Sequence, residues 1–208
     1  MDAGVQCRSI RVPRAGLSMR AMAVEFPEVL GHPNRLPFEG CLTVLDVPSD
    51  KAPSGARGHR VVLTREAAQA ALPSLLGMAV DYKAGWDGHD ARQKCGIITA
   101  ANICDGAAGA GKRLLVSGYL YARDFPEFNS LAQKSGGLAA GANGEMGMSY
   151  ELADAHVADM RAPVWTLTRA TFTGAAILLR DKAAYRATSF RLRGAGQVAA
   201  RSIAVQRQ

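Results

Sequence analysis

The chain has 208 residues, 48% of them hydrophobic and 21% charged, which is enough for one domain with a packed core, and its formal net charge is +7. No apolar stretch approaches the ~18 residues that a membrane span needs, and the N-terminus is too polar for a secretory signal, so a cytoplasmic protein without membrane contact is expected. The four cysteines lack C-x-x-C spacing, which argues against a zinc module and against a disulfide scaffold.

The first third of the chain predicts an extension, two strands and a helix. Residues 1–36 show no sustained period and form the predicted N-terminal extension. Alternating apolar residues predict strands over 38–47 and 59–63. A helix is expected to begin at the N-cap Thr64, to be shortened or kinked by Pro73, and to end at Gly77.

The rest of the chain reads mainly as strand. Short strands are predicted over 78–82, 95–104 and 113–122, the last two as a hairpin, and a helix is predicted over 125–135. Two long strands follow over 146–159 and 162–179. The predicted domain covers residues 37–180, and residues 181–208 form a basic C-terminal tail. This order predicts a mainly β (α+β) fold, an antiparallel β-barrel flanked by helices.

Two residues could carry nucleophilic chemistry. His89 lies in the loop "WDGHDARQK", directly before a strong strand, which suits a general base. Ser149 lies in "GEMGMSYE", where strand geometry would project its hydroxyl to one face. A serine hydroxyl is a poor nucleophile unless a base removes its proton. Periodicity alone does not bring the two together, and an ordinary strand serine remains the simpler interpretation of Ser149.

A resemblance joins these segments. The set "GHDARQKCGIIT", "LLVSGYLYARDFPE", "GMSYE" and "FTGAAIL" resembles the prohead (capsid maturation) serine proteases of tailed bacteriophages, relatives of the herpesvirus assemblin proteases. The match rests on His89 followed seven residues later by Gly96, on the next strand, and on Gly147-Met148-Ser149, in this order over roughly residues 40–180. The resemblance implies an assemblin-like fold, with Ser149 as nucleophile and His89 as general base.

The third catalytic residue is left open by the resemblance. The strand "VWTLTRATFTG" has no His, Asp or Glu where the family places its third member. Glu151, on the face of Ser149 by the period of two, and His156 are the candidates, although each can instead be a solvated strand residue. A Ser–His dyad, or a threonine such as Thr171 that orients the base, is a further alternative. Arg169 is a candidate for the oxyanion site only through the resemblance.

The implied function is that of a serine endopeptidase without cofactor or metal, which cleaves the phage scaffold, the major capsid protein precursor or both during head maturation, with self-cleavage left open. Its place would be the host cytoplasm, inside the assembling procapsid. Arginine-rich chain ends suit acidic partners, and no nucleic-acid-binding motif accompanies them. Assemblin relatives work as dimers, so a homodimer is one expectation. The alternative is a catalytically inactive, protease-like head-assembly or scaffolding protein.

Overall fold

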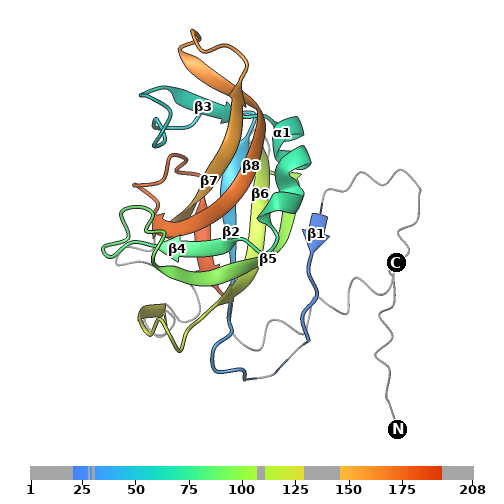
Figure 1. The fold of residues 1–208 in the computed structure, drawn as a ribbon, viewed down its shortest axis with the longest axis vertical. Coiled ribbons are helices and arrows are strands. Elements are labelled where there is room, and N and C mark those ends of the chain that lie inside the picture. Colours follow the sequence, from blue (N-terminus) through green and yellow to red (C-terminus); the bar gives the residue numbers. More distant parts are fainter. Residues whose placement is uncertain (1–20, 28, 30, 107–110, 129–145, 194–208) are drawn as a thin grey trace, which may run out of the picture.

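The computed structural model describes residues 21–27, 29, 31–106, 111–128 and 146–193 (Figure 1). The elements of these residues are β1 (Ala21–Ala23), β2 (Leu36–Leu45), β3 (Arg60–Leu63), α1 (Arg65–Ala71), the 3-10 helix η1 (Leu72–Leu75), β4 (Ala79–Tyr82), β5 (Lys94–Asp105), β6 (Lys112–Leu120), β7 (Met146–Val157), β8 (Val164–Leu179) and β9 (Ser189–Leu192). The predicted mainly β fold is confirmed.

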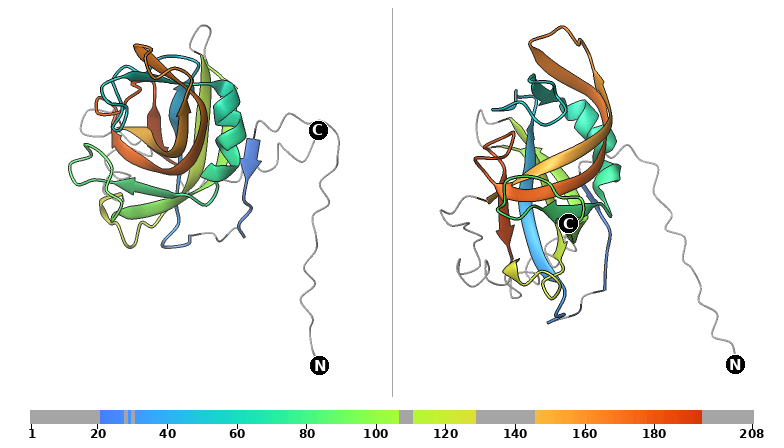
Figure 2. Two further views of the ribbon diagram at one scale, coloured as in Figure 1. Left: turned by 45° about the horizontal axis from the view of Figure 1, so that its top comes forward. Right: turned by 60° about the vertical axis from the view of Figure 1, so that its left-hand side comes forward.

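The described strands form a single mixed sheet. Their order is β3-β8-β4-β5-β6-β2-β9, with β1 paired to β5 and β7 paired to β8. Most strand pairs are antiparallel, as predicted, but β8 runs parallel to both β3 and β4, which makes the sheet mixed. These parallel partners lie about a hundred residues apart in the sequence, and no local pattern reveals such a pairing. The sheet curls around the core without closing on itself (Figure 2).

The core lies inside this curled sheet. Its largest fully buried side chains come from strands β2, β3 and β5 to β8, from η1 and from Phe128, and they include Phe38, Leu42, Leu45, Leu63, Leu72, Leu75, Ile98, Leu114, Met146 and Phe172. On α1, Ala67, Ala68 and Ala71 are the buried residues. Small side chains let this helix lie close to the sheet, beside β8 (Figure 1).

The helix after β3 begins at its predicted N-cap and is shortened near Pro73 as expected, but it ends before the predicted Gly77. The Thr64 hydroxyl accepts a hydrogen bond from the Ala67 amide at 3.1 Å, which makes Thr64 the N-cap. The α-helix ends at Ala71, and a 3-10 turn that contains Pro73 continues to Leu75. Proline removes an amide donor and clashes with the preceding turn, so it shortens the α-helix. Of the helix predicted over 125–135, the structure describes only the first part, where Glu127 and Phe128 are helical.

Strands also occur in both segments that flank the predicted domain. β1, inside residues 1–36, pairs with β5 from Ala21 opposite Asn102. β9, inside residues 181–208, pairs with β2 and buries Phe190 and Leu192. The segment S-F-R-L is too short for its alternation to distinguish a strand from a turn in the sequence. It is a strand in the structure because it pairs with β2. Within the part of the chain that is described, no helix has the length and apolarity to cross a membrane.

Candidate functional site

The loop between β4 and β5 carries His89 and is fixed by aromatic packing. The ring of Trp86 lies 4.9 Å from that of Tyr82 and 5.5 Å from that of Phe128, centroid to centroid. The Trp86 carbonyl accepts a hydrogen bond of 2.8 Å from the Leu179 amide at the end of β8. This bond ties the middle of the loop to the sheet, only three residues before His89 in the chain.

The acidic residues next to His89 in sequence do not face it. Asp87 forms an ion pair of 3.1 Å with Lys83, four residues earlier in the loop. Asp90 accepts hydrogen bonds from the Arg92 amide at 3.0 Å and from the Arg92 guanidinium at 3.2 Å. The guanidinium bond is the main cause of the lowered pKa of the Asp90 carboxyl. Both carboxylates thus hold the shape of the loop instead of contacting the imidazole.

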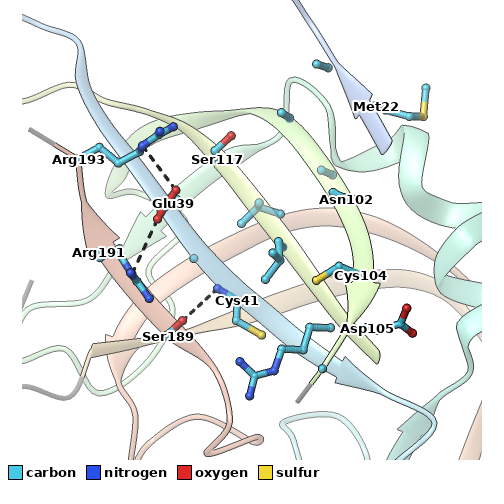
Figure 3. Close-up of a pocket in the computed structure, with 18 residues that line it drawn as sticks. Met22, Glu39, Cys41, Asn102, Cys104, Asp105, Ser117, Ser189, Arg191 and Arg193 are labelled. Atoms are coloured by element: carbon cyan, nitrogen blue, oxygen red, sulfur yellow. Dashed lines mark hydrogen bonds and ion pairs between the residues drawn. The ribbon is translucent and has the colours of Figure 1, made fainter. Parts of the chain in front are cut away.

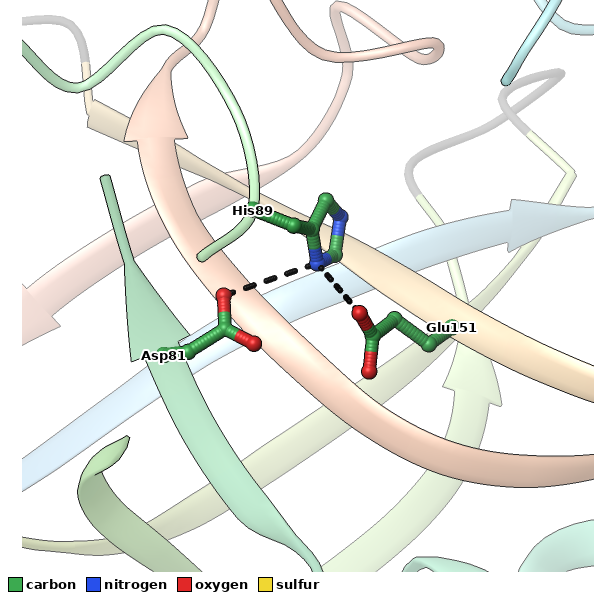
Figure 4. Close-up of side chains that lie close together, drawn as sticks. All are labelled: Asp81, His89 and Glu151. Atoms are coloured by element: carbon green, nitrogen blue, oxygen red, sulfur yellow. Dashed lines mark ion pairs between the residues drawn. The ribbon is translucent and has the colours of Figure 1, made fainter. Parts of the chain in front are cut away.

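His89 lies between two other carboxylates, one from each of two strands (Figure 4). Its Nδ1 is 3.3 Å from Glu151 Oε1 on β7 and 3.5 Å from Asp81 Oδ1 on β4. Neither contact has the orientation of a hydrogen bond, and both Nδ1 and Asp81 Oδ1 are buried without one. The arrangement thus brings two carboxylates from different strands to one ring nitrogen.

Asp81 is the site residue that the sequence did not identify. It is 0% exposed, and its second oxygen, Oδ2, accepts a hydrogen bond from Lys94 Nζ at 3.0 Å. A signal was present: an aspartate stands in the otherwise apolar strand segment "MAVDY". Because a buried carboxylate needs a partner, a charge at such a position indicates a nearby cation or a functional site.

Glu151 reaches His89 because β8 has a glycine opposite it. Gly174 pairs with Glu151 in the antiparallel register of β7 and β8. A Cβ at Gly174 would lie 2.7 Å from Glu151 Oε2, closer than such atoms approach. Gly174 therefore leaves the space that the Glu151 carboxylate occupies. Of the two candidates for the third catalytic residue, Glu151 is the one that contacts His89.

Ser149 lies two residues before Glu151 on β7. The register is regular from Met146 to Glu151, so the side chains of Ser149 and Glu151 project from the same face of the strand, about 7 Å apart along it. Among the described residues, no hydrogen bond joins Ser149 to His89. The intervening Tyr150 projects to the opposite face, packs against Phe172 at 5.9 Å, and has a pKa raised well above its ordinary value by burial.

The two glycines of the recognised motifs serve strand packing. A Cβ at Gly96 would lie 2.5 Å from the Tyr119 carbonyl oxygen on the neighbouring β6. A Cβ at Gly147 would lie 2.6 Å from Thr188 Oγ1. Glycine at these positions lets neighbouring backbone or side chains approach. Of the motif residues, His89 and Ser149 are thus the ones with reactive side chains.

His156 and Arg169 lie away from the His89 cluster. His156 is exposed, and its Nδ1 lies 3.0 Å from Thr168 Oγ1. Arg169 is exposed opposite His156 in the register. Seven residues separate His156 from Ser149, which corresponds to roughly 20 Å along a strand. The structure therefore does not bring either residue to Ser149.

The buried thiols are poor alternatives as nucleophiles. Burial raises the pKa of Cys95 to about 12 and that of Cys41 to about 11. Both thiols are therefore protonated near neutral pH, whereas the thiolate is the reactive form. Cys41, Cys95 and Cys104 are all free.

A separate groove of about 640 Å³ lies between β1, β2, β5, β6 and β9 (Figure 3). On its β2 side, Glu39 lies 3.9 Å from Arg191 Nε and 3.5 Å from Arg193 Nε. The Ser189 hydroxyl accepts a hydrogen bond of 3.3 Å from the Cys41 amide. None of the residues predicted for catalysis lines this groove. The chemistry of the His89 cluster is therefore located elsewhere on the molecule.

Comparison with known proteins adds no relative. No protein-family model, no curated protein and no solved structure matches this chain. What can be said of its function rests on its own residues and on the arrangement of Asp81, His89, Ser149 and Glu151.

Proposed function

We propose that the chain is a serine endopeptidase of the prohead type, with Ser149 as nucleophile and His89 as general base. The observation that carries the proposal is the position of the His89 imidazole. Its Nδ1 faces the carboxylates of Asp81 and Glu151, and Ser149 projects from the same face of β7 as Glu151.

This arrangement is compatible with the separate roles of the three residues in a catalytic triad. When Nδ1 carries a proton and faces a carboxylate, the other ring nitrogen, Nε2, is left with its lone pair free. Nε2 can then remove the hydroxyl proton of Ser149 while Oγ attacks a peptide carbonyl. The imidazolium that forms returns its proton to the leaving amine, and water hydrolyses the acyl-enzyme. The proximity of two carboxylates favours that imidazolium.

The two carboxylates are assigned different contributions. Glu151 is nearer to Nδ1 and one third exposed, and we assign to it the role of the third triad member. Asp81 is fully buried and shares its charge with Lys94, so it is rigid and partly neutralised. We propose that Asp81 positions the imidazole from the β4 side. A Ser–His dyad without a third member would not need either contact.

The biological setting follows the resemblance. A curled, mainly β sheet is compatible with an assemblin-like barrel, and the net charge of +7 suits acidic scaffold segments. The proposed substrates are the phage scaffold and major capsid protein precursors, cleaved inside the procapsid, with a homodimer as the proposed assembly. The competing proposal, an inactive head-assembly protein of the same fold, is favoured by the lack of a hydrogen bond between Ser149 and His89. Catalytic hydrogen bonds are, however, often long without substrate.

A serine-reactive fluorophosphonate probe separates these two proposals without a known substrate. The full-length wild-type chain is expected to be labelled covalently, whereas Ser149→Ala abolishes labelling and His89→Ala slows it by roughly 100-fold or more. Ser54→Ala, at an exposed turn serine, serves as the matched control and should be labelled like the wild type. Labelling that persists in Ser149→Ala, or a wild type that is never labelled, would refute the assignment. Co-expression with the head scaffold and capsid protein then tests the substrate class.

A further inference from the structure

The His89 cluster has the composition of a cation site as well as that of a triad. One atom each from Asp81, His89 and Glu151 lie within 4.8 Å of one another. They come from β4, from the loop before β5 and from β7, so three separate segments converge on one point (Figure 4). Two carboxylates and an imidazole are ligands that divalent transition metals and zinc accept.

The distances fit an ion between these atoms. Metal–ligand bonds of about 2.0–2.1 Å in a tetrahedral site place neighbouring ligand atoms about 3.3–3.4 Å apart. The two contacts of His89 Nδ1, at 3.3 Å and 3.5 Å, have this length. The third pair, between Asp81 and Glu151, needs a further approach, which the partly exposed Glu151 side chain can provide.

An unsatisfied buried atom gives an independent indication. Asp81 is 0% exposed, and its Oδ1 has no hydrogen bond although it points at His89 Nδ1, which has none either. Buried polar atoms are nearly always paired with protein, water or an ion. The other oxygen, Oδ2, is already held by Lys94 at 3.0 Å, so Oδ1 remains for a ligand.

The local charge also leaves room for a cation. Two carboxylates and one lysine sum to −1, a negative charge that a bound cation can balance. The nitrogen ligand favours a zinc-class ion over Ca²⁺ or Mg²⁺, which prefer sets made of oxygen alone. His89 and Glu151 are 28% and 33% exposed, which provides an entry path from solvent.

We propose that Asp81, His89 and Glu151 bind a divalent cation of the zinc class, and that this ion inhibits the enzyme. The inhibition, unlike the binding, rests on the proposed protease function. An ion at Nδ1 fixes the imidazole tautomer with its proton on Nε2, because a metal-bound imidazole is neutral and offers one lone pair. Nε2 then has no lone pair with which to accept the proton of Ser149.

Calorimetric titration of the full-length chain with ZnCl₂ alone tests the binding. We expect one ion per chain for the wild type, loss of that binding in His89→Ala, and binding weaker by roughly tenfold or more in Glu151→Gln, which keeps the shape and folding of a partly exposed side chain. His156→Ala, at an exposed histidine outside the cluster, should bind as the wild type does. Unchanged binding in both His89→Ala and Glu151→Gln would overturn the site.

Two further measurements separate the site from its consequence. Co²⁺ in place of Zn²⁺ should give no thiolate-to-metal charge-transfer band, and such a band would assign the ion to a cysteine instead. In the fluorophosphonate assay, Zn²⁺ should suppress labelling of the wild type, and a chelator should restore it. Labelling that continues at saturating Zn²⁺ would overturn the inhibition. A wild type that binds Zn²⁺ at His89 but is never labelled would refute the protease function while leaving the cation site intact.

Discussion

Replacing Lys94 by methionine tests whether Asp81 is a buried charge that needs its lysine. Asp81 is fully buried, whereas the Lys94 side chain is 38% exposed. Removing the lysine leaves a buried carboxylate, and breaking a buried ion pair in this way typically costs about 3–5 kcal/mol. We expect about 3 kcal/mol for Lys94→Met, at the lower end, because the Lys94 side chain is 38% exposed and water already screens part of its charge.

Replacing the aspartate instead of the lysine should lower the free energy of unfolding by less. Asp81→Asn leaves an ammonium group that water can reach, so the expected loss is about 1–2 kcal/mol, at or below the lower end of the ~1.5–3 kcal/mol that a hydrogen bond to a charged group contributes. Lys83→Met is the control, since Lys83 pairs with Asp87 at a similar 3.1 Å but both side chains are about half exposed. Such surface pairs contribute about 0–1 kcal/mol.

Urea unfolding of the four proteins, followed by circular dichroism, gives these free energies. At roughly 2–4 °C per kcal/mol for a chain of this size, Lys94→Met should also lower Tm by about 6–12 °C. If Lys94→Met and Lys83→Met have the same free energy of unfolding, Asp81 is hydrated in solution. The reasoning on its burial, and on its unsatisfied Oδ1, would then be refuted.

Two further predictions concern the glycine behind Glu151 and a buried thiol. In Gly174→Ala the new Cβ, 2.7 Å from Glu151 Oε2, should displace the carboxylate by about 0.7 Å and slow fluorophosphonate labelling of Ser149 by roughly tenfold to 100-fold. Gly88→Ala is the unaffected control, because the atom nearest to its added Cβ is Lys83 Cδ at 4.0 Å, an ordinary contact. Equal labelling rates would show that the position of Glu151 does not matter. Burial raises the pKa of Cys95 from its ordinary 9.0 to about 12, so above pH 9 the unfolded chain releases a proton that the folded chain keeps. The stability that is present below pH 9 is therefore lost between pH 9 and pH 12, by up to about 1.4 kcal/mol per pH unit. Urea unfolding at pH 8, 9 and 10 should show that the free energy of unfolding falls less steeply with pH in Cys95→Ala than in the wild type. An equal fall in both proteins would contradict the burial of the thiol.

Local signals predict the elements of this fold better than their pairing. Thr64 and Pro73 mark the ends of a helix through their own chemistry, and the hairpin of β5 and β6 joins neighbours in the chain. The parallel pairs of β8 with β3 and β4 were not predicted, because they depend on which distant segments meet. β1 and β9 are short segments that are strands because they pair with β5 and β2, respectively.

The candidate site likewise contains residues that local sequence signals indicate and residues that only strand pairing brings together. The period of two on β7 relates Glu151 to Ser149, and the loop position suggests His89 as a base. Asp81 was missed because its role depends on contacts with His89 and Lys94 that arise from the pairing of β4 with β5 and β8. Asp87 and Asp90, adjacent to His89 in sequence, are bound to Lys83 and Arg92 instead.

The long strand β8 also determines when the site can assemble. Its first residues pair with β3 and its later ones with β4, while β7 lies along its other side. Strands β2 to β6 leave the ribosome earlier, but β4 lacks its second neighbour until residues 175–177 have been made. Non-local pairings of this kind form slowly. The Glu151 strand β7 is therefore fixed beside His89 only late in synthesis, so a nascent chain that ends before β8 lacks the complete candidate cluster.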